Sequence, residues 1–329
     1  MSYRHLSESE RGVIFYLHMD GCSNAEIGGQ IGRHASTIGR ELRRNVGVLG
    51  QYLPGVAQRL ANRRRRQGRH RRRTGDAALM AHVERKIKAR WSPEQIAGRL
   101  EVQPPKHLVG VRISHATIYR WIWACPERSK RLRPYLRVAS KKRRKPYGRP
   151  SRRGQIPNRV GIEHRPAEAE ARRRLGDWEG DTVVGRARSG YVATCVDRAS
   201  RYLLARPQRG CSAKETTASL HDAMRRLPAD RRRTLTVDNG REFSGHERIG
   251  RLLGLAVYFA HPYSSWERGT NENTNGLLRQ YLPKRMDFSE LTDWALASYV
   301  WQLNNRPRKC LNYRTPAEVF WHRPVALTM

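Results

Sequence analysis

Apolar residues in the first 45 positions recur at helical spacing and predict three short helices. Ile27 and Ile31 lie one helical turn apart. The tetrapeptides SESE at 7–10 and SNAE at 23–26 fit the capping box, in which a serine oxygen and a glutamate carboxylate satisfy N–H groups at a helix start. The sequence GRHAS, which follows Ile31, supplies a tight turn before the last helix. Two helices with apolar inner faces and a short turn between them form a helix-turn-helix.

A related pattern returns after residue 90. The segment WSPEQIAGRL has Ser92 as a helix cap, Pro93 at the first helical position and Gln95 to complete a capping box. The sequence Thr-Ile-x-Arg occurs at 37–40 and again at 117–120. We therefore expect a second helix-turn-helix, with a longer loop between its helices. For both units the alternative is a plain helical hairpin inside a core.

From about residue 160 the pattern changes to strands alternating with helices. Three strands come first, with a tight turn after the second, and helices and two further strands follow. The expected strands span 177–185, 191–200, 201–208, 233–240 and 255–260, and the expected helices span 212–227, 246–254, 271–282 and 291–307. This is the ribonuclease-H order. The expected fold is multidomain, with N-terminal all-α helix-turn-helix units followed by an α/β ribonuclease-H-like domain that has a mixed five-stranded sheet and flanking helices.

The charge of the chain points to a polyanionic partner. Lys and Arg number 65 against 29 Asp and Glu, which gives a formal net charge of +36. Such a field attracts nucleic acid by neutralising phosphates and releasing their counterions. Residues 1–160 carry a net charge of +27 and residues 161–329 carry +9. We expect the front half to be the main part that grips DNA.

The outer faces of the two predicted recognition helices supply the candidate DNA contacts. These are Ser36, Thr37, Arg40, Arg43, Arg44, Thr117 and Arg120. Two basic tracts, at 63–73 and 141–159, are expected to follow DNA as extended segments, with an inert spacer as the alternative. We expect five parts: a helix-turn-helix domain at 1–60, a basic helical connector at 61–90, the second unit at 91–125, a basic Pro/Gly-containing linker at 126–160 and a catalytic domain at 161–329.

The cysteines and the apolar runs exclude several other classes of protein. The five cysteines are scattered without a Cys-x-x-Cys pair, so neither a zinc site nor a disulfide framework is expected. No apolar run of about 18 residues exists and no secretory signal precedes Ser7. We expect a cytoplasmic protein that associates with the nucleoid when bound to DNA.

Three carboxylates stand in settings that suggest catalysis. Asp181 lies within the first strand of the C-terminal region, Asp238 lies in a DNG turn where the fourth strand ends, and Glu272 lies near the start of a late helix. The first and fourth strands are neighbours in the ribonuclease-H topology, so their acids would meet at one edge, with the helix above them. Carboxylates are the ligands that Mg²⁺ accepts, and two such ions promote in-line displacement at phosphorus.

Each acid has a neighbour that competes for the same role. Strand alternation puts Asp177 and Glu179 on the same face as Asp181, so the local sequence does not choose among them. Glu242 competes with Asp238 in the same way, and Glu267 competes with Glu272. Asp197, in VDRASRY, is expected to cap a turn.

Four separated segments in order closely resemble the IS-thirty family of bacterial insertion-sequence transposases. They are GDWEGDTVVG, TVDNGREFSGHE, PYSSWERGTNENTNGLLRQYLPK and LNNRPRKCLNYRTPAEVF, and the N-terminal segments YRHLSESERGVI and IGRHASTIGRELRRN resemble that family's N-terminal domain. The resemblance covers nearly the whole chain. It departs at Ser265, where proline is usual, and at Arg285-Met286, where Gly-Thr is usual.

The resemblance implies a DDE transposase whose acidic triad falls on Asp181, Asp238 and Glu272, with 33 residues between the last two. It implies two Mg²⁺ ions, which Mn²⁺ can replace, and double-stranded DNA partners in the form of terminal inverted repeats and target DNA. Arg279 falls where related transposases carry a basic residue, with an ordinary solvated arginine as the alternative.

The implied reaction is cleavage of the element ends by hydrolysis and joining of the freed 3′-OH to target DNA. Pairing two ends implies a homodimer or higher oligomer. The other function considered is a catalytically silent, domesticated transposase that acts as a DNA-binding repressor. Asn271, Asn273 and Asn275 match the family motif, with helix capping and DNA contact both open as roles.

Overall fold

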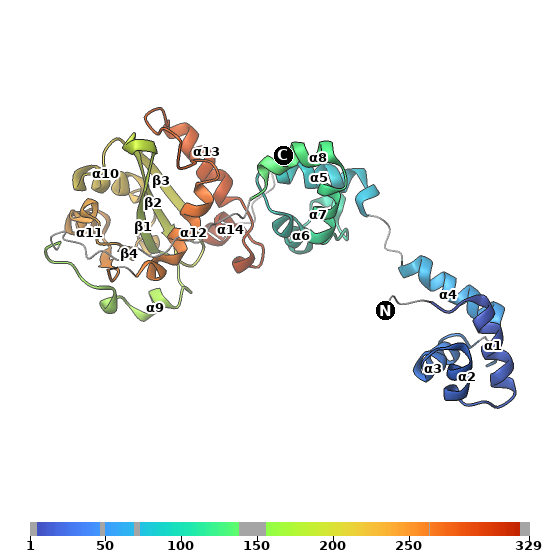
Figure 1. Ribbon diagram of the computed structural model, residues 1–329. Coiled ribbons are helices and arrows are strands. Elements are labelled where there is room, and N and C mark those ends of the chain that lie inside the picture. Colours follow the sequence, from blue (N-terminus) through green and yellow to red (C-terminus); the bar gives the residue numbers. More distant parts are fainter. Residues whose placement is uncertain (1–4, 47–49, 69–72, 138–155, 263, 323–329) are drawn as a thin grey trace. The chain divides into compact units, whose positions relative to one another are not determined.

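A computed structural model describes residues 5–46, 50–68, 73–137, 156–262 and 264–322 (Figure 1). The chain divides into two compact units, Met1–Asp76 and Ala77–Met329. Part of the basic tract at 63–73 and most of the tract at 141–159 lie outside the described residues. No helix in the described ranges has both the length and the apolar character needed to cross a membrane.

The first unit is a small bundle of four helices, and it contains the predicted helix-turn-helix. The helices are α1 (Glu8–Met19), α2 (Asn24–Ile31), α3 (Ala35–Arg44) and α4 (Pro54–Gly68). Capping boxes start α1 at Ser7 and α2 at Ser23, as predicted. Gly32 ends α2 at φ 65°, in the left-handed region where glycine carries no Cβ penalty.

Apolar side chains from all four helices and their connections form the core of this unit. Its buried members are Leu6, Ile14, Ile27, Ile38, Tyr52 and Ala57. A buried ion pair joins α1 to α3, because Arg11 Nε lies 2.6 Å from Glu41 Oε1. The apolar contact and the ion pair together hold α3 in place and leave its opposite face to solvent.

The second unit begins with a helical part built from α5 (Ala77–Lys88), α6 (Pro93–Val102), α7 (His115–Trp123) and α8 (Pro126–Leu132), in the region where a second helix-turn-helix was predicted. The capping box predicted at the start of α6 is present, with Ser92 and Gln95 as its members. The sequence placed 77–88 in a basic connector, whereas α5 buries Leu79, Val83 and Ile87 in the same core as α6 and α7. The apolar residues of α5 therefore make this helix part of the same packed group as α6 and α7.

The rest of the second unit is built on a five-stranded mixed sheet. The strands are β1 (Asp177–Val184), β2 (Tyr191–Asp197), β3 (Leu203–Gln208), β4 (Thr234–Val237) and β5 (Ala256–Phe259), in the spatial order β3-β2-β1-β4-β5. β1, β2 and β3 pair antiparallel, and β1, β4 and β5 pair parallel. This is the predicted ribonuclease-H-like arrangement.

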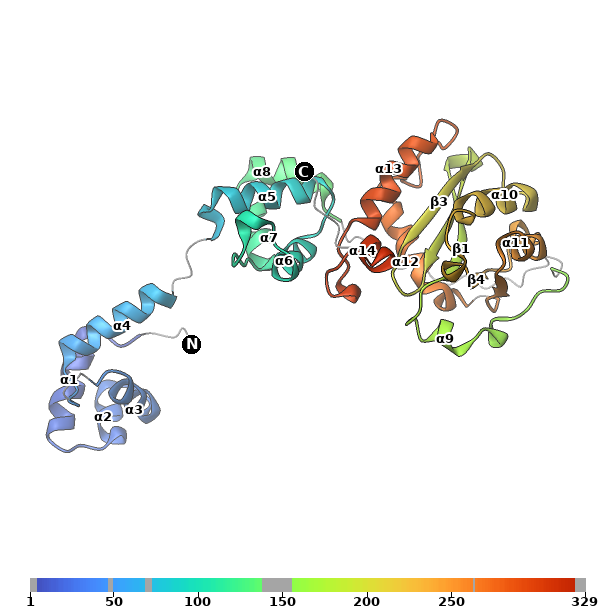
Figure 2. The ribbon, with the colours of Figure 1, turned by 180° about the vertical axis from the view of Figure 1, so that it is seen from behind.

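Helices cover both faces of the sheet (Figures 1 and 2). On one face α10 (Ala213–Met224) and α11 (His246–Leu253) pack on a core that contains Trp178 and Cys195. On the other face α12 (Gly269–Leu278) and α13 (Asp293–Asn304) pack on Val183 and Val196. Alternation along β1 places Asp177, Glu179 and Asp181 on the α12 side.

Two short helices complete the unit. α9 (Ala167–Glu170) precedes β1, and α14 (Pro316–Trp321) starts with a capping box formed by Thr315 and Glu318. Phe320 of α14 packs edge-on against Trp178 at a centroid distance of 5.6 Å. The sequence prediction contained neither helix.

Two ion pairs link α6 to the C-terminal segment. Arg99 pairs with Glu318, and both side chains are 5% exposed. Lys309 Nζ lies 2.7 Å from Glu94 Oε1, but these side chains are 71% and 47% exposed. Breaking a buried pair leaves an uncompensated charge in a low dielectric, whereas water screens an exposed pair.

We expect Glu318→Gln to lower the free energy of unfolding by about 3–5 kcal/mol, because Arg99 then remains buried without a counter-charge. Urea denaturation followed by tryptophan fluorescence measures the change. Glu94→Gln is the matched control, since it breaks an exposed pair, and it should cost less than about 1 kcal/mol. Equal effects of the two variants would show that the buried pair does not hold these segments together.

Candidate active site

The parallel register of β1 and β4 brings Asp181 and Asp238 to the same level of the sheet. Glu179 lies opposite Thr236, and the two aspartates each follow two residues later. Asp238 comes directly after the last residue of β4, and its Oδ1 accepts a hydrogen bond from the Gly240 amide at 2.9 Å. This Asx-type turn fixes the carboxylate at the carboxyl end of the strand.

An arginine bridges these two carboxylates. Arg268 Nη2 lies 3.2 Å from Asp238 Oδ2, and Arg268 Nη1 lies 3.7 Å from Asp181 Oδ1. Burial raises the pKa of Asp181, Arg268 opposes the rise, and the neighbouring Asp238 carboxylate adds to it. The two acids therefore repel one another, and a positive charge lies between them.

The Arg268 side chain is only 14% exposed, and its Nε is buried without a hydrogen-bond partner among the described residues. Asp181 and Asp238 remain 29% and 39% exposed. An accessible pair of acids around a single cation matches the ligands that a divalent ion accepts. Asp181 and Asp238 therefore fit a metal site, and the guanidinium stands in for its charge.

Glu272 lies in the first turn of α12, near the start of the helix as predicted. Its side chain is exposed and makes no hydrogen bond or ion pair with any described residue. Helical spacing puts it on the same face as Arg268 and Asn275. Both neighbours reach Asp181, and Asn275 Nδ2 donates to Asp181 Oδ2 at 2.9 Å.

The structure therefore brings two of the three candidate acids together and places the third on the helix face beside them. Within the described ranges, no group of three His, Cys, Asp or Glu side chains lies close enough to hold a metal ion. The sequence reasoning did not identify Arg268, the residue that lies between the acids. Its position four residues before Glu272 was the available signal, since i, i+4 residues share a helix face.

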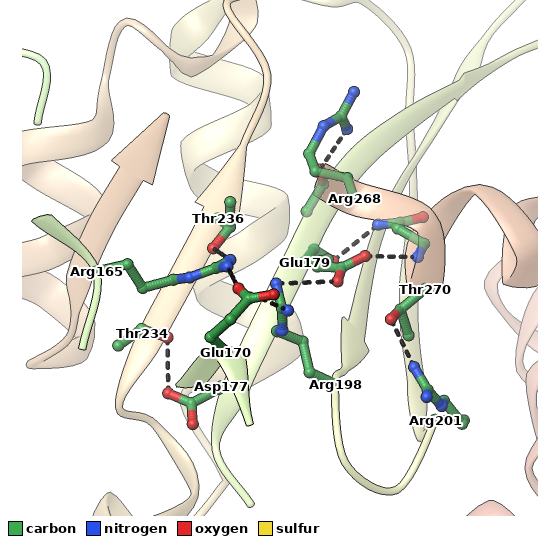
Figure 3. Close-up of polar contacts among 12 residues, drawn as sticks. Arg165, Glu170, Asp177, Glu179, Arg198, Arg201, Thr234, Thr236, Arg268 and Thr270 are labelled. Atoms are coloured by element: carbon green, nitrogen blue, oxygen red, sulfur yellow. Dashed lines mark hydrogen bonds and ion pairs between the residues drawn. The ribbon is translucent and has the colours of Figure 1, made fainter. Parts of the chain in front are cut away.

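The structure separates Asp181 from its two competitors on β1. Asp177 is 1% exposed, and its carboxylate accepts from Arg174 Nε at 2.7 Å and from Thr234 Oγ1 at 2.8 Å. Glu179 is fully buried, and its carboxylate lies 3.3 Å from Arg198 Nη1 (Figure 3). Only Asp181 of the three is accessible to substrate.

The other acids that were alternatives to the three candidates lie in turns or pair with other residues. Glu267 Oε1 lies 2.8 Å from His261 Nδ1. Asp197 caps its turn as predicted, because its Oδ1 accepts from the Ser200 amide at 2.7 Å. Glu242 lies half-buried in the turn after Asp238.

Arg279 does not behave as an ordinary solvated arginine. Its Nη2 donates to the Val184 carbonyl at 3.0 Å, at the end of β1. Burial lowers the pKa of Arg279, and attraction from Asp181 opposes that change. The guanidinium thus lies at the carboxyl end of β1, three residues beyond Asp181.

The candidate DNA-contacting residues lie on two capped helices. On α3, Ser36, Arg40, Arg43 and Arg44 are exposed and Thr37 is half-buried. Arg40 folds back along the helix, with Nη2 2.8 Å from Ser36 Oγ.

On α7, Arg120 is exposed and Thr117 is half-buried, and the Ser114 hydroxyl caps the helix. Each helix thus presents polar and basic side chains on its outer face.

Two segments of the chain match protein-family models. Residues 2–45 match a family described as a helix-turn-helix domain, and residues 171–265 match the integrase core domain. The catalytic core domain of BIV integrase aligns with 44% of this chain and 93% of its own, at 21% identity and a TM-score of 0.36.

Full-length relatives are closer in sequence. The transposase for insertion sequence element IS4351 of Bacteroides fragilis is 40% identical over 96% of this chain and 95% of its own. The transposase for IS1086 of Cupriavidus metallidurans is 37% identical over 96% and 94% of the two chains. The transposase InsI for IS30C of Escherichia coli is 37% identical over 98% and 85%. The chain therefore belongs to the IS-thirty family of insertion-sequence transposases, with an N-terminal helix-turn-helix domain and a ribonuclease-H-like integrase core.

Proposed function

We propose that this transposase binds the terminal inverted repeats of its element, hydrolyses a phosphodiester bond at each end and joins the freed 3′-OH to target DNA. The observation that carries the proposal is the pair Asp181 and Asp238. Two partly exposed acids, one within β1 and one directly after β4, flank one positive charge. A pair of this kind is costly to a fold unless a cation is bound there.

Asp181, Asp238 and Glu272 are the residues that would hold two Mg²⁺ ions, or Mn²⁺ in their place. When bound, such ions lower the pKa of water and stabilise charge on the attacking and leaving oxygens. Glu272 suits the third position because it lies on the same α12 face as Asn275, which already bonds Asp181. Asn275 also orients the Asp181 carboxylate, because its Nδ2 donates a hydrogen bond to one of the two carboxylate oxygens.

The other residues bind and orient DNA. Arg279, fixed at the end of β1 by the Val184 carbonyl, is positioned to hold the terminal phosphate beside the acids. The exposed face of α3 would enter the major groove, with Arg40 as the main base-contacting residue. The α7 residues Thr117 and Arg120 would contact a second part of the repeat.

Cleavage needs no covalent bond between protein and DNA, because water and then a DNA hydroxyl are the nucleophiles. Joining two ends in one reaction requires two sites, so we propose a homodimer or a higher oligomer in the end-paired complex. The DNA-bound protein would reside on the nucleoid.

A catalytically silent DNA-binding repressor is the second candidate. The observation that favours it is Arg268, which neutralises Asp181 and Asp238 without any metal. The two candidates differ in what the protein does to an end-containing duplex after binding it.

We expect Asp238→Asn to lower nicking of a duplex with the terminal repeat by at least about 100-fold, because a metal ligand is lost. Binding to the same duplex should be retained. Gel analysis of nicked and joined products with Mg²⁺ or Mn²⁺ measures the first effect, and a mobility-shift titration measures the second. Glu242→Gln is the control, because it changes a neighbouring acid in the turn after Asp238. Binding without nicking by the wild-type protein would establish the repressor instead.

We expect Arg40→Ala to weaken binding to the terminal repeat by about 1–3 kcal/mol, as loss of a base contact does, and to weaken binding to random DNA less. Fluorescence anisotropy with the two duplexes at a fixed salt concentration gives both affinities. Arg59→Ala, an exposed arginine of α4, should leave their ratio unchanged. Equal losses on both duplexes for Arg40→Ala would assign Arg40 to phosphate contact.

A further inference from the structure

Helix α12 begins without a cap from its own sequence. The residue at its N-cap position, Arg268, makes no capping hydrogen bond with its side chain. A carboxylate of the neighbouring strand takes over this function: the Asn271 amide donates to Glu179 Oε2 at 2.8 Å. An anion at a helix N-terminus satisfies a free N–H and interacts favourably with the helix dipole.

The Asn271 side chain donates a second hydrogen bond to the same residue. Asn271 is fully buried, and its Nδ2 donates to the Glu179 carbonyl at 2.7 Å. Its Oδ1 accepts from Thr194 Oγ1 of β2 at 3.4 Å. We call the two hydrogen bonds between Glu179 and Asn271 the α12 clasp. They join one residue of β1 to one residue of α12 through both backbone and side chain.

Buried arginine charge holds the Glu179 carboxylate in place. Arg198 is 1% exposed, and its Nη groups lie 3.3 Å from Glu179 Oε1 and 3.3 Å from Glu170 Oε2 (Figure 3). Beside the clasp, Arg201 Nη1 donates to Thr270 Oγ1 at 2.6 Å. The start of α12 is therefore tied to the sheet by polar contacts in a water-poor environment, where such contacts fix geometry well.

The clasp lies next to the proposed metal ligands on both elements. Glu179 is two residues before Asp181 on the same face of β1, and Asn271 immediately precedes Glu272 on α12. A shift of α12 along β1 would therefore move the Glu272 carboxylate relative to Asp181. We propose that Asn271 is a positioning residue, whose clasp with Glu179 sets the place of Glu272 beside Asp181 and Asp238.

This proposal rests on the proposed metal-binding function of those three acids, and it separates the roles of the asparagines. Asn271 would act inside the protein through the clasp, and Asn275 would orient Asp181 directly. Asn273 is exposed, so it takes no part in either contact. Polar partners behind metal ligands commonly change metal affinity or activity by about 10–100-fold when they are removed.

A matched control exists on the next helix. Asn304 of α13 is 4% exposed, and its side chain also makes two hydrogen bonds with one residue of a strand, here the edge strand β3. Its Nδ2 donates to the Leu203 carbonyl at 2.8 Å, and its Oδ1 accepts from the Leu203 amide at 2.8 Å. Loss of either asparagine side chain should lower the melting temperature, but Asn304 lies beside none of the three acids.

The test is Mn²⁺ binding to the full-length protein, measured by the free-Mn²⁺ signal in electron paramagnetic resonance. The specific site is defined as the binding lost in Asp181→Asn. We expect Asn271→Ala to weaken this binding by about 10–100-fold. Asn304→Ala should change it by no more than about twofold, as an independent site does. Equal effects of the two variants would overturn the positioning role and leave Asn271 as part of general stability.

Glu179→Gln provides a second test that preserves volume. A glutamine oxygen still accepts from the Asn271 amide, and the hydrogen bond to the Glu179 backbone carbonyl is unchanged. Arg198 loses a counter-charge, so the melting temperature should fall, but Mn²⁺ affinity should stay within about twofold of wild type. A loss as large as that of Asp181→Asn would make Glu179 a ligand, which overturns the clasp. If Asn271→Ala does not fold, Asn271→Ser replaces it in the same comparison, because serine keeps the amide bond to Glu179 and lacks the Nδ2 donor.

The same measurement separates the two proposals. If wild type and Asp181→Asn bind Mn²⁺ equally, the metal assignment itself fails, and the role of the clasp fails with it. If the wild type binds Mn²⁺, Asp181→Asn does not, and Asn271→Ala binds as well as Asn304→Ala, the metal assignment stands and the clasp alone is wrong.

Discussion

Electrostatic repulsion between Asp181 and Asp238 is the constraint on which the account of this site depends. The parallel pairing of β1 with β4 fixes both aspartates at one end of the sheet, and neither can move away without breaking that register. A fold that holds two acids together must supply a positive charge, and Arg268 supplies it in this structure. The same need for positive charge makes the pair suitable for a divalent ion.

The three acids on one face of β1 have the same carboxylate group but differ in their surroundings. Asp177 and Glu179 are buried and neutralised by Arg174 and Arg198, so their charges act within the fold. Asp181 is the last of the row and is accessible to solvent. The row thus changes from buried to solvent-accessible along a single strand, and the α12 clasp lies at the point of change.

Local patterns predicted much of the architecture, because capping boxes and apolar spacing act over a few residues. The helices that start at Ser7, Ser23 and Ser92 were predicted by this signal, and so was the order of the five strands. The capping box at 315–318 carried the same signal for α14 but was not used. α5 packs in the same core as α6 and α7, but the sequence prediction assigned it to a basic connector because of the basic residues around it.

The site was harder to predict, since alternation left three acids of β1 equivalent and only the family resemblance favoured Asp181. Burial, which depends on Arg198 and α12, is a long-range property that spacing does not reveal. The bridging Arg268 lies 30 residues from Asp238 and 87 from Asp181 in the sequence, and the cap that Glu179 gives α12 spans 92 residues. The exposed position of Glu272 was likewise not predicted from its place in the motif.

The most direct test of the central claim is a crystal structure of the protein with its cleaved element end and Mn²⁺, with the metal located by anomalous scattering. The account predicts Mn²⁺ bound by Asp181, Asp238 and Glu272, with Arg268 displaced from between the two aspartates. Mn²⁺ bound elsewhere, with Arg268 still bridging Asp181 and Asp238 beside the DNA end, would contradict it.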